Sequence, residues 1–206
     1  MKLYYSPGAC SLGVHILLEE IGKPFEVVRT PVAEGAAKTP EYLALNPKAK
    51  VPLLIRDNGR PLTELPAISY YLAGLNPQAK LLPADADLAA DAMEMVEYIA
   101  SYVHMQGFTR WARPGNFAFA EADYERTKAR GIEMFLEGLN LLDGKIAGRE
   151  FAVGDHFTVA DAALVFVSRW ATRADVARPA NIEAHLQRMK QRPSVLRAYA
   201  TEGLDF

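Results

Sequence analysis

Cysteine is nearly absent from this sequence, since Cys10 is the only one among 206 residues. A single cysteine excludes an internal disulfide, so we expect the chain in a reducing compartment such as the cytoplasm. The sequence also lacks an apolar run long enough to span a bilayer, and residues 1–5 show no secretory signal. We therefore expect no membrane partner.

A strong charge of one sign is missing as well, because the formal net charge is −2. Up to Lys80 there are 9 basic and 7 acidic residues, or +2, and the remaining 14 basic and 18 acidic residues give −4. Neither half has the basic excess typical of nucleic-acid-binding proteins, which excludes a nucleic-acid partner. The length allows one large or two small globular domains.

The first 80 residues alternate short strands with helices. Residues 2–5 and 25–29 are expected to be strands on either side of a helix over residues 11–22, the pattern of a parallel βαβ unit. The dipeptide Asn58-Gly59 separates two further strand-like runs, which predicts a hairpin with a type I′ turn. A helix is expected to open at Pro66.

After residue 80 only helical periodicity is found. Long helices are expected from about Asp85 and over residues 121–147. Thr158 and Asp161 resemble a capping box before an apolar run, which predicts a helix at the centre of the second half. The sequence thus predicts an α/β domain over residues 1–78 and an all-α helical bundle over residues 85–206.

Cys10 stands where the first expected helix begins. Unpaired backbone N–H groups and the positive end of the helix dipole stabilise a thiolate at such a position, which predicts a depressed pKa and a reactive sulfur. The alternative is a buried cysteine that acts as a small hydrophobic side chain. The local sequence leaves both interpretations open.

Several short motifs follow one another in an order that is typical of a known family. They are residues 2–12, 46–48, 51–52, 63–64, 67–68, 103–104, 154–162, 191–193 and 202–204. Together they resemble the motifs of glutathione S-transferases, and among these the bacterial beta class. The resemblance runs from one end of the chain to the other.

The resemblance implies a thioredoxin-like N-terminal domain (βαβ, ββα) that binds glutathione as co-substrate, and a helical domain that lines the site of an apolar electrophile. It also implies a homodimer and no metal. The catalytic residues that it implies are Cys10 and His104. The implied glutathione-binding residues are Lys50, Val51, Pro52, Glu64 and Leu65, with a cis bond before Pro52 that aims the Val51 backbone at the ligand.

Some of these residues also have an ordinary structural explanation. In the family Glu64 holds the ammonium group of glutathione, but an acidic residue is favourable near any helix start. A lone helical histidine is more often structural than catalytic, and only the Val-His motif of the beta class favours a catalytic His104. His15 and His156 are expected to be structural, and His185 is expected on a surface helix.

Three positions depart from the beta-class pattern. Leu65 stands where serine or glycine is usual, Met105 replaces a lysine, and Glu34 lies where basic residues are common. Each change removes a contact or positive potential from the site of an anionic ligand. The sequence therefore predicts weaker glutathione binding than in typical beta-class enzymes, and tighter binding in a Leu65→Ser variant.

The expected function is a detoxifying glutathione transferase, which conjugates the glutathione thiol to electrophiles or exchanges it with mixed disulfides. A glutathione-dependent dehalogenase or isomerase is not distinguishable from the sequence. A non-catalytic binding or interaction protein of the same fold is a further alternative, because fold does not determine function. The electrophile stays open, since apolar helical surface is not specific.

Overall fold

The four strands at the start of the chain form one mixed sheet in the order β2-β1-β3-β4. The computed structural model describes residues 1–205. In it β1 (Lys2–Tyr5) pairs in parallel with β2 (Glu26–Arg29) and antiparallel with β3 (Leu53–Ile55). The last strand, β4 (Pro61–Thr63), pairs antiparallel with β3, so the expected βαβ and ββ units are confirmed.

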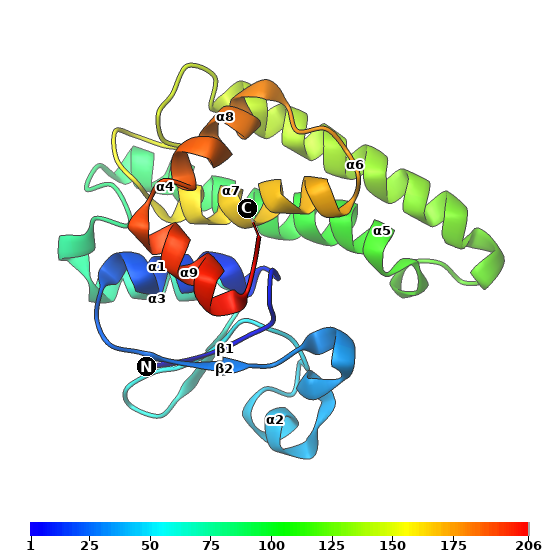
Figure 1. The fold of residues 1–206 in the computed structure, drawn as a ribbon, viewed down its shortest axis with the longest axis horizontal. Coiled ribbons are helices and arrows are strands. Elements are labelled where there is room, and N and C mark those ends of the chain that lie inside the picture. Colours follow the sequence, from blue (N-terminus) through cyan, green and yellow to red (C-terminus); the bar gives the residue numbers. More distant parts are fainter. Residues whose placement is uncertain (206) are drawn as a thin grey trace.

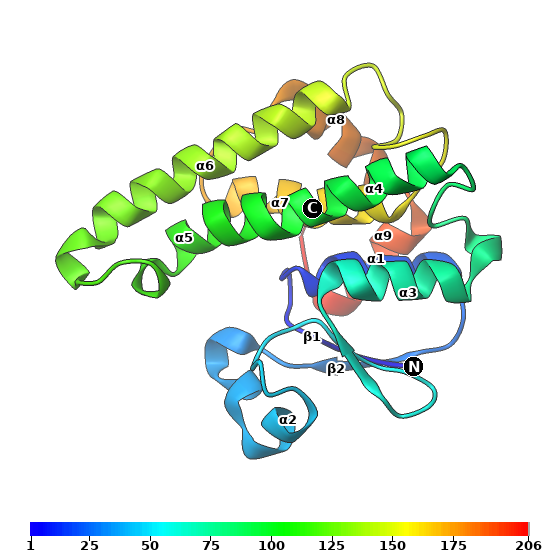
Figure 2. The same cartoon turned by 180° about the vertical axis from the view of Figure 1, so that it is seen from behind.

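Two helices lie between this sheet and the second half of the chain. They are α1 (Ser11–Ile21), which crosses from β1 to β2, and α3 (Leu65–Leu75), which follows the hairpin (Figure 1). The short α2 (Pro40–Leu45) lies on the other side of the sheet (Figure 2). Single 3-10 turns complete this half: η1 (Val32–Glu34), η2 (Ala36–Lys38) and η3 (Pro77–Ala79).

The hairpin between β3 and β4 does not contain the expected type I′ turn. Gly59 N–H donates to the Arg56 carbonyl (2.8 Å) and Arg56 N–H donates to the Arg60 carbonyl (3.1 Å). A type I′ turn needs a positive φ at both central residues, yet only Gly59 has one (φ 77°) and Asn58 does not. The connection is therefore a longer turn that ends in a left-handed glycine.

The second half is entirely helical, and one long rod runs beside another (Figure 2). The first rod joins α4 (Ala86–Tyr98), a π-helical segment η4 (Ile99–Phe108) and α5 (Thr109–Ala112), and the second is α6 (Tyr124–Lys145). No helix among residues 1–205 combines the length and apolarity needed to cross a membrane. The remaining elements are η5 (Pro114–Asn116), η6 (Glu121–Asp123), α7 (Val159–Arg173), α8 (Ala180–Met189) and α9 (Pro193–Glu202).

The two rods approach so closely that side chains are excluded at two glycines. A Cβ placed on Gly107 would lie 2.8 Å from the Cα of Phe135, and one on Gly131 would lie 2.5 Å from the backbone nitrogen of Trp111. Both distances are shorter than any real Cβ contact. This packing fixes η4, the segment that carries His104.

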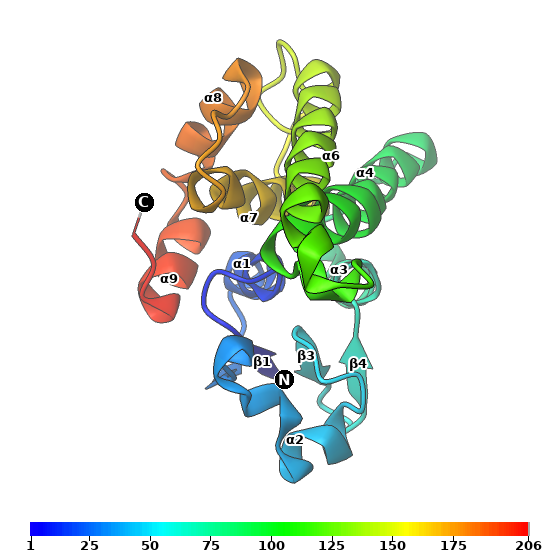
Figure 3. The same cartoon turned by 90° about the vertical axis from the view of Figure 1, so that its right-hand side faces the viewer.

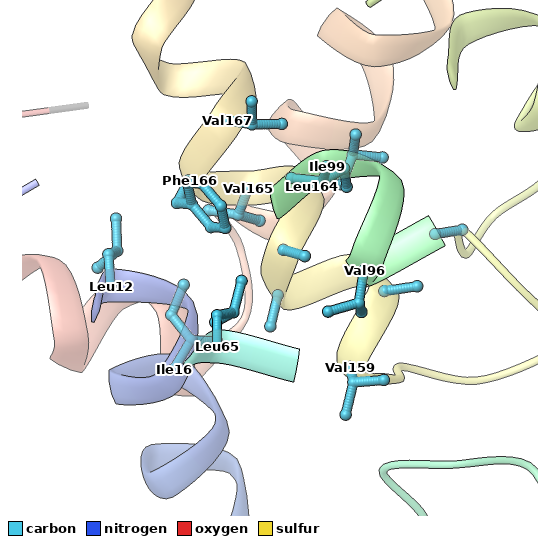
Figure 4. Packing of buried hydrophobic residues seen from close by; sticks show 14 of the residues in the cluster. Leu12, Ile16, Leu65, Val96, Ile99, Val159, Leu164, Val165, Phe166 and Val167 are labelled. Atoms are coloured by element: carbon cyan, nitrogen blue, oxygen red, sulfur yellow. The ribbon is translucent and has the colours of Figure 1, made fainter. Parts of the chain in front are cut away.

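The helix α7 occupies the centre of the molecule, as the apolar run predicted. Its first ten residues, from Val159 to Ser168, are all buried, and they pack against α1, α3 and α4 (Figure 4). The expected capping box is confirmed, because the Asp161 carboxylate accepts the Thr158 N–H at 2.8 Å. The predicted fold class, a thioredoxin-like α/β domain followed by an all-α domain, is confirmed.

Candidate active site

Cys10 lies at the N-terminus of α1, in the turn that joins β1 to this helix. Its backbone is helical (φ −60°, ψ −19°), and its Sγ lies 3.5 Å from the Val51 carbonyl oxygen, which accepts the thiol proton. The Val51–Pro52 peptide is cis, as the family pattern implied. The first turn of α1 and the loop before β3 thus face each other across the sulfur.

The environment of Cys10 does not depress its pKa, which corrects the expectation from its helix position. Burial raises the pKa of the Cys10 thiol to about 12. The backbone N–H groups of Cys10 and Ser11 lower this pKa, as expected at a helix N-terminus, but their effect is smaller than that of desolvation. At neutral pH the sulfur therefore carries its proton.

The loop before Cys10 is held by the second half of the chain at Gly8. Its N–H donates to the buried Glu202 carboxylate of α9 (2.8 Å), and its carbonyl accepts from Trp170 Nε1 of α7 (2.7 Å). The other oxygen of Glu202 bonds the buried His15 ring at 2.9 Å. No pattern in the sequence indicated a role for Glu202 or Trp170, although residues 202–204 formed one of the motifs.

Side chains of α2 and of the residue that follows it hold the loop that carries Lys50 and Val51. The Lys50 carbonyl accepts hydrogen bonds from Tyr42 Oη (2.6 Å) and Asn46 Nδ2 (2.7 Å). The Lys50 residue is exposed, and its positive charge lowers the pKa of both Cys10 and His104. Both groups therefore lie within electrostatic range of this ammonium group.

Glu64 is exposed at the start of α3, with an unusual backbone conformation (φ 71°, ψ 125°). Its carboxylate is paired with the Lys48 ammonium at 2.6 Å, and that ammonium also donates to Thr63 Oγ1 at 2.8 Å. The site thus offers a carboxylate and an ammonium side by side. Glu34, expected to repel an anionic ligand, lies 3.4 Å from Arg29, whose positive charge offsets it.

The Leu65 side chain does not face the ligand site that its position suggested. It is 5% exposed and belongs to the same buried hydrophobic cluster as Leu12 and Ile16 of α1 (Figure 4). It packs closely enough that its Cδ1 lies 3.2 Å from a Cβ placed on Gly13. The Leu65 side chain thus contributes to the core, and its effect on glutathione binding stays a prediction.

A Leu65→Ser variant is accordingly expected to lose stability. Removing a buried leucine side chain costs about 2–5 kcal/mol through lost burial and the cavity that it leaves. Leu75→Ser on the same helix, where the leucine is 46% exposed, serves as the matched control and should change little. Thermal unfolding of both variants measures the difference. Equal melting temperatures would contradict the core position of Leu65.

His104 lies on η4 against an aromatic cluster from α7. Its ring is edge-to-face with Trp170 (centroids 4.7 Å apart) and with Phe166 (6.3 Å). Burial, with smaller contributions from the positive charges of Lys50 and Arg113, lowers the pKa of His104 to about 4. The imidazole is therefore neutral at physiological pH.

We expect a nuclear magnetic resonance titration of His104 to give a midpoint near pH 4, well below the ordinary 6.5. The unfolded chain takes up this proton first as the pH falls, so the same shift removes stability between about pH 6.5 and pH 4. A His104→Gln variant should lack this part of the acid destabilisation. A midpoint at the ordinary value would contradict the desolvated environment.

The other histidines have structural partners. His156 bonds the Asp155 carboxylate (2.7 Å) and the Lys80 carbonyl (3.1 Å), in the loop before α7. His185 is not on the surface as expected: it is fully buried and bonds Asp161 at 2.8 Å. Within residues 1–205 no group of three His, Cys, Asp or Glu side chains could hold a metal ion.

Both halves of the chain match the sequence models of one protein family. Residues 8–75 match the glutathione S-transferase N-terminal domain, and residues 92–193 match the glutathione S-transferase C-terminal domain. The chain belongs to the glutathione S-transferase family. This transferase is 38% identical to glutathione S-transferase GstA of Escherichia coli O157:H7, over 99% of this chain and 100% of that protein.

Solved structures agree with this assignment along the whole chain. A glutathione transferase homologue from Sulfitobacter with bound glutathione is 30% identical, with a TM-score of 0.91 over 99% of this chain and 98% of that one. A bacterial beta class glutathione S-transferase from Sphingomonas chungbukensis is 33% identical, with a TM-score of 0.86 over 100% of both chains. The expected family and its transferase activity are thereby confirmed.

Proposed function

We propose that this transferase binds glutathione along residues 1–78, brings the glutathione sulfur between Cys10 and His104, and holds the electrophile on residues 85–206. The observation that carries the proposal is the position of Cys10, whose Sγ lies 3.5 Å from the carbonyl before a cis proline. The relative solved with bound glutathione supports the choice of ligand.

The charges near the start of α3 suit the amino-acid end of glutathione, which is a zwitterion. Glu64 is assigned to the ammonium group of the ligand, in place of its present partner Lys48. The backbone N–H groups at the start of α3, beginning with that of Leu65, are assigned to the neighbouring carboxylate, because helix N-termini bind anions. Lys50 supplies positive potential near the sulfur, and Val51 and Pro52 shape the backbone that faces it.

The protonated Cys10 thiol is assigned the role of a hydrogen-bond donor to the glutathione sulfur. A thiol with a pKa of about 12 is almost never a thiolate at neutral pH, so it donates a proton rather than attacking. Neutral His104, whose pKa is too low to hold a thiol proton, is assigned to accept a hydrogen bond from the glutathione thiol. The proton passes to water while the sulfur electron pair forms the new bond and the leaving group departs. This favours conjugation over disulfide exchange at Cys10, which would need its thiolate.

The surroundings of His104 support an apolar electrophile. His104 and Met105 are partly exposed, and the ring of Trp170 backs His104. Trp170 in turn stacks on Phe108 at 4.3 Å. Trp170 and Phe108 are buried behind the site, so the surface that favours an apolar electrophile comes from the partly exposed His104 and Met105.

Three further properties are part of the proposal. The Val103-His104 motif and the likeness to the Sphingomonas chungbukensis structure support the beta class. The family pattern supports a homodimer, which sedimentation velocity would test. The single cysteine supports a reducing cytoplasm.

Calorimetry with glutathione and steady-state conjugation of an aryl halide test the proposal together. Glu64→Gln is expected to weaken glutathione binding about ten- to a hundredfold, the value of one hydrogen bond to a charged group. Glu121→Gln, which changes an exposed glutamate on η6, is the matched control. Tight binding without turnover would favour the non-catalytic alternative, and no binding to the wild-type chain would contradict the proposal.

His104→Ala separates binding from chemistry. If His104 orients the glutathione thiol through a hydrogen bond, the variant should lower kcat by about a hundredfold while glutathione affinity stays within a factor of two. A variant with the same kcat as the wild type from pH 6 to pH 8 would show that His104 has no role in the reaction. The melting temperature of the variant shows whether any loss reflects unfolding instead.

A further inference from the structure

A cavity of about 460 Å³ lies at the C-terminal end of α7, and its lining is rich in positive charge. The helices α7, α8 and α9 are neighbours on this side of the molecule (Figure 3). Four of the lining residues are cationic, in a chain whose net charge is −2. They are Arg169, Arg173, Arg178 and Lys190.

Two of these guanidinium groups have no carboxylate partner among residues 1–205. Arg169 has a buried Nε atom without any hydrogen-bond partner in the described part of the chain. Arg173 is exposed at the rim, and its contact is with the ring of Phe108, 5.6 Å from the centroid. A buried guanidinium N–H without an acceptor is unfavourable, so this end of the cavity is suited to an added acceptor.

A third guanidinium, that of Arg178, is held in a fixed orientation. It donates to Thr172 Oγ1 (2.6 Å) and to the Ser168 carbonyl (3.5 Å), and it pairs with Glu183 of α8. Its planar fork is therefore arranged before any ligand arrives. Tyr199 adds no negative charge, because burial raises its pKa to about 12 even though Arg169 and Arg178 lower it.

Among residues 1–205 the cavity wall contributes one carboxylate, that of Asp205. With Arg178 paired to Glu183, the two guanidinium groups of Arg169 and Arg173 still carry more charge than this one carboxylate. A singly charged anion would gain few contacts in this cavity to replace the water contacts that it loses. A small molecule with two or more negative oxygens could bridge Arg169 and Arg173, because guanidinium groups bind carboxylate and phosphate in a bidentate way.

We propose that this cavity is a binding site for a small, multiply charged oxyanion, a phosphorylated or polycarboxylate metabolite, separate from the glutathione site. The volume fits a ligand of metabolite size. Arg169 also reaches the loop of Cys10, since a Cβ placed on Gly8 would lie 2.7 Å from its Nη1. The occupied cavity therefore borders the loop that positions the thiol.

Calorimetry with inorganic pyrophosphate and with citrate, in metal-free buffer at constant ionic strength, tests the site. Arg173→Gln is expected to weaken binding about tenfold or more, and Asp205→Asn is expected to tighten it. Arg173→Lys should fall between wild type and Arg173→Gln, because it keeps the charge but not the fork. Arg126→Gln, which removes the same charge from an 85% exposed side chain on α6, should bind as wild type does.

Each result has a defined meaning. Binding of pyrophosphate alone assigns a phosphorylated ligand, and binding of citrate alone assigns a polycarboxylate. Binding by a Glu64→Gln variant at wild-type strength places the anion outside the glutathione site. The proposal is overturned if neither probe binds the wild-type chain, or if Arg173→Gln and Arg126→Gln bind equally well at unchanged melting temperatures.

Discussion

Alkylation of Cys10 by iodoacetamide is expected to be about thirty- to sixtyfold slower in the folded, ligand-free protein than in the denatured chain at neutral pH. The pKa rises from 9.0 to about 12, which lowers the thiolate fraction about a thousandfold. The more basic thiolate is intrinsically a better nucleophile, and this recovers part of the loss. Mass spectrometry measures both rates, and every adduct reports the one cysteine.

The pH dependence of the two alkylation rates gives a second test of the raised pKa. Below pH 9 both rates should rise about tenfold per pH unit, because both thiols are mostly protonated. Above pH 9 the denatured chain reaches its plateau, while the folded protein continues to accelerate toward pH 12, so the ratio closes. Folded protein that reacts at pH 7 as fast as the denatured chain would contradict the raised pKa, and folded protein that reacts faster would show the depressed pKa of a reactive thiolate.

Replacing Asp161 by alanine is expected to destabilise the fold by about 3–5 kcal/mol. Its fully buried carboxylate accepts hydrogen bonds from the Thr158 N–H and the Ala152 N–H, each at 2.8 Å, and contacts His185 Nε2 at 2.8 Å. Asp161→Ala would leave these three groups without an acceptor in the interior. At about 2–4 °C per kcal/mol, the melting temperature should fall by about 6–20 °C.

The matched control for this change is Asp155→Ala. Asp155 is 98% exposed at its side chain and pairs with His156, so its removal should cost little. Differential scanning calorimetry of both variants gives the comparison. A loss for Asp161→Ala no larger than that for Asp155→Ala would show that water replaces the missing carboxylate.

Local sequence patterns were enough to predict α7 and its N-terminal cap. Thr158 and Asp161 are three residues apart, and that spacing alone predicts the cap of α7. The apolar run after them predicts a central helix, because no face of it suits water. Such patterns are readable because the interacting groups are neighbours in the chain.

The β3–β4 hairpin shows that a local sequence pattern does not always determine the local structure. Asn58-Gly59 correctly predicts a turn, but the turn type depends on how β3 and β4 meet, and only Gly59 takes a positive φ. His185 shows the same limit at long range. Its helix looks amphipathic, yet the His185 ring is buried and bonds the Asp161 carboxylate, 24 residues earlier in the sequence.

The sequence by itself determined the two-part fold, the family, the place of Cys10 at a helix start, and the candidate residues of the site. Only the tertiary structure decided what those residues experience. Leu65 turns into the core instead of the ligand site, and Gly8 is held by Glu202 and Trp170 from the far end of the chain. A side chain's pKa depends on everything packed around it: desolvation by distant segments outweighs the helix N-terminus that the sequence makes visible at Cys10.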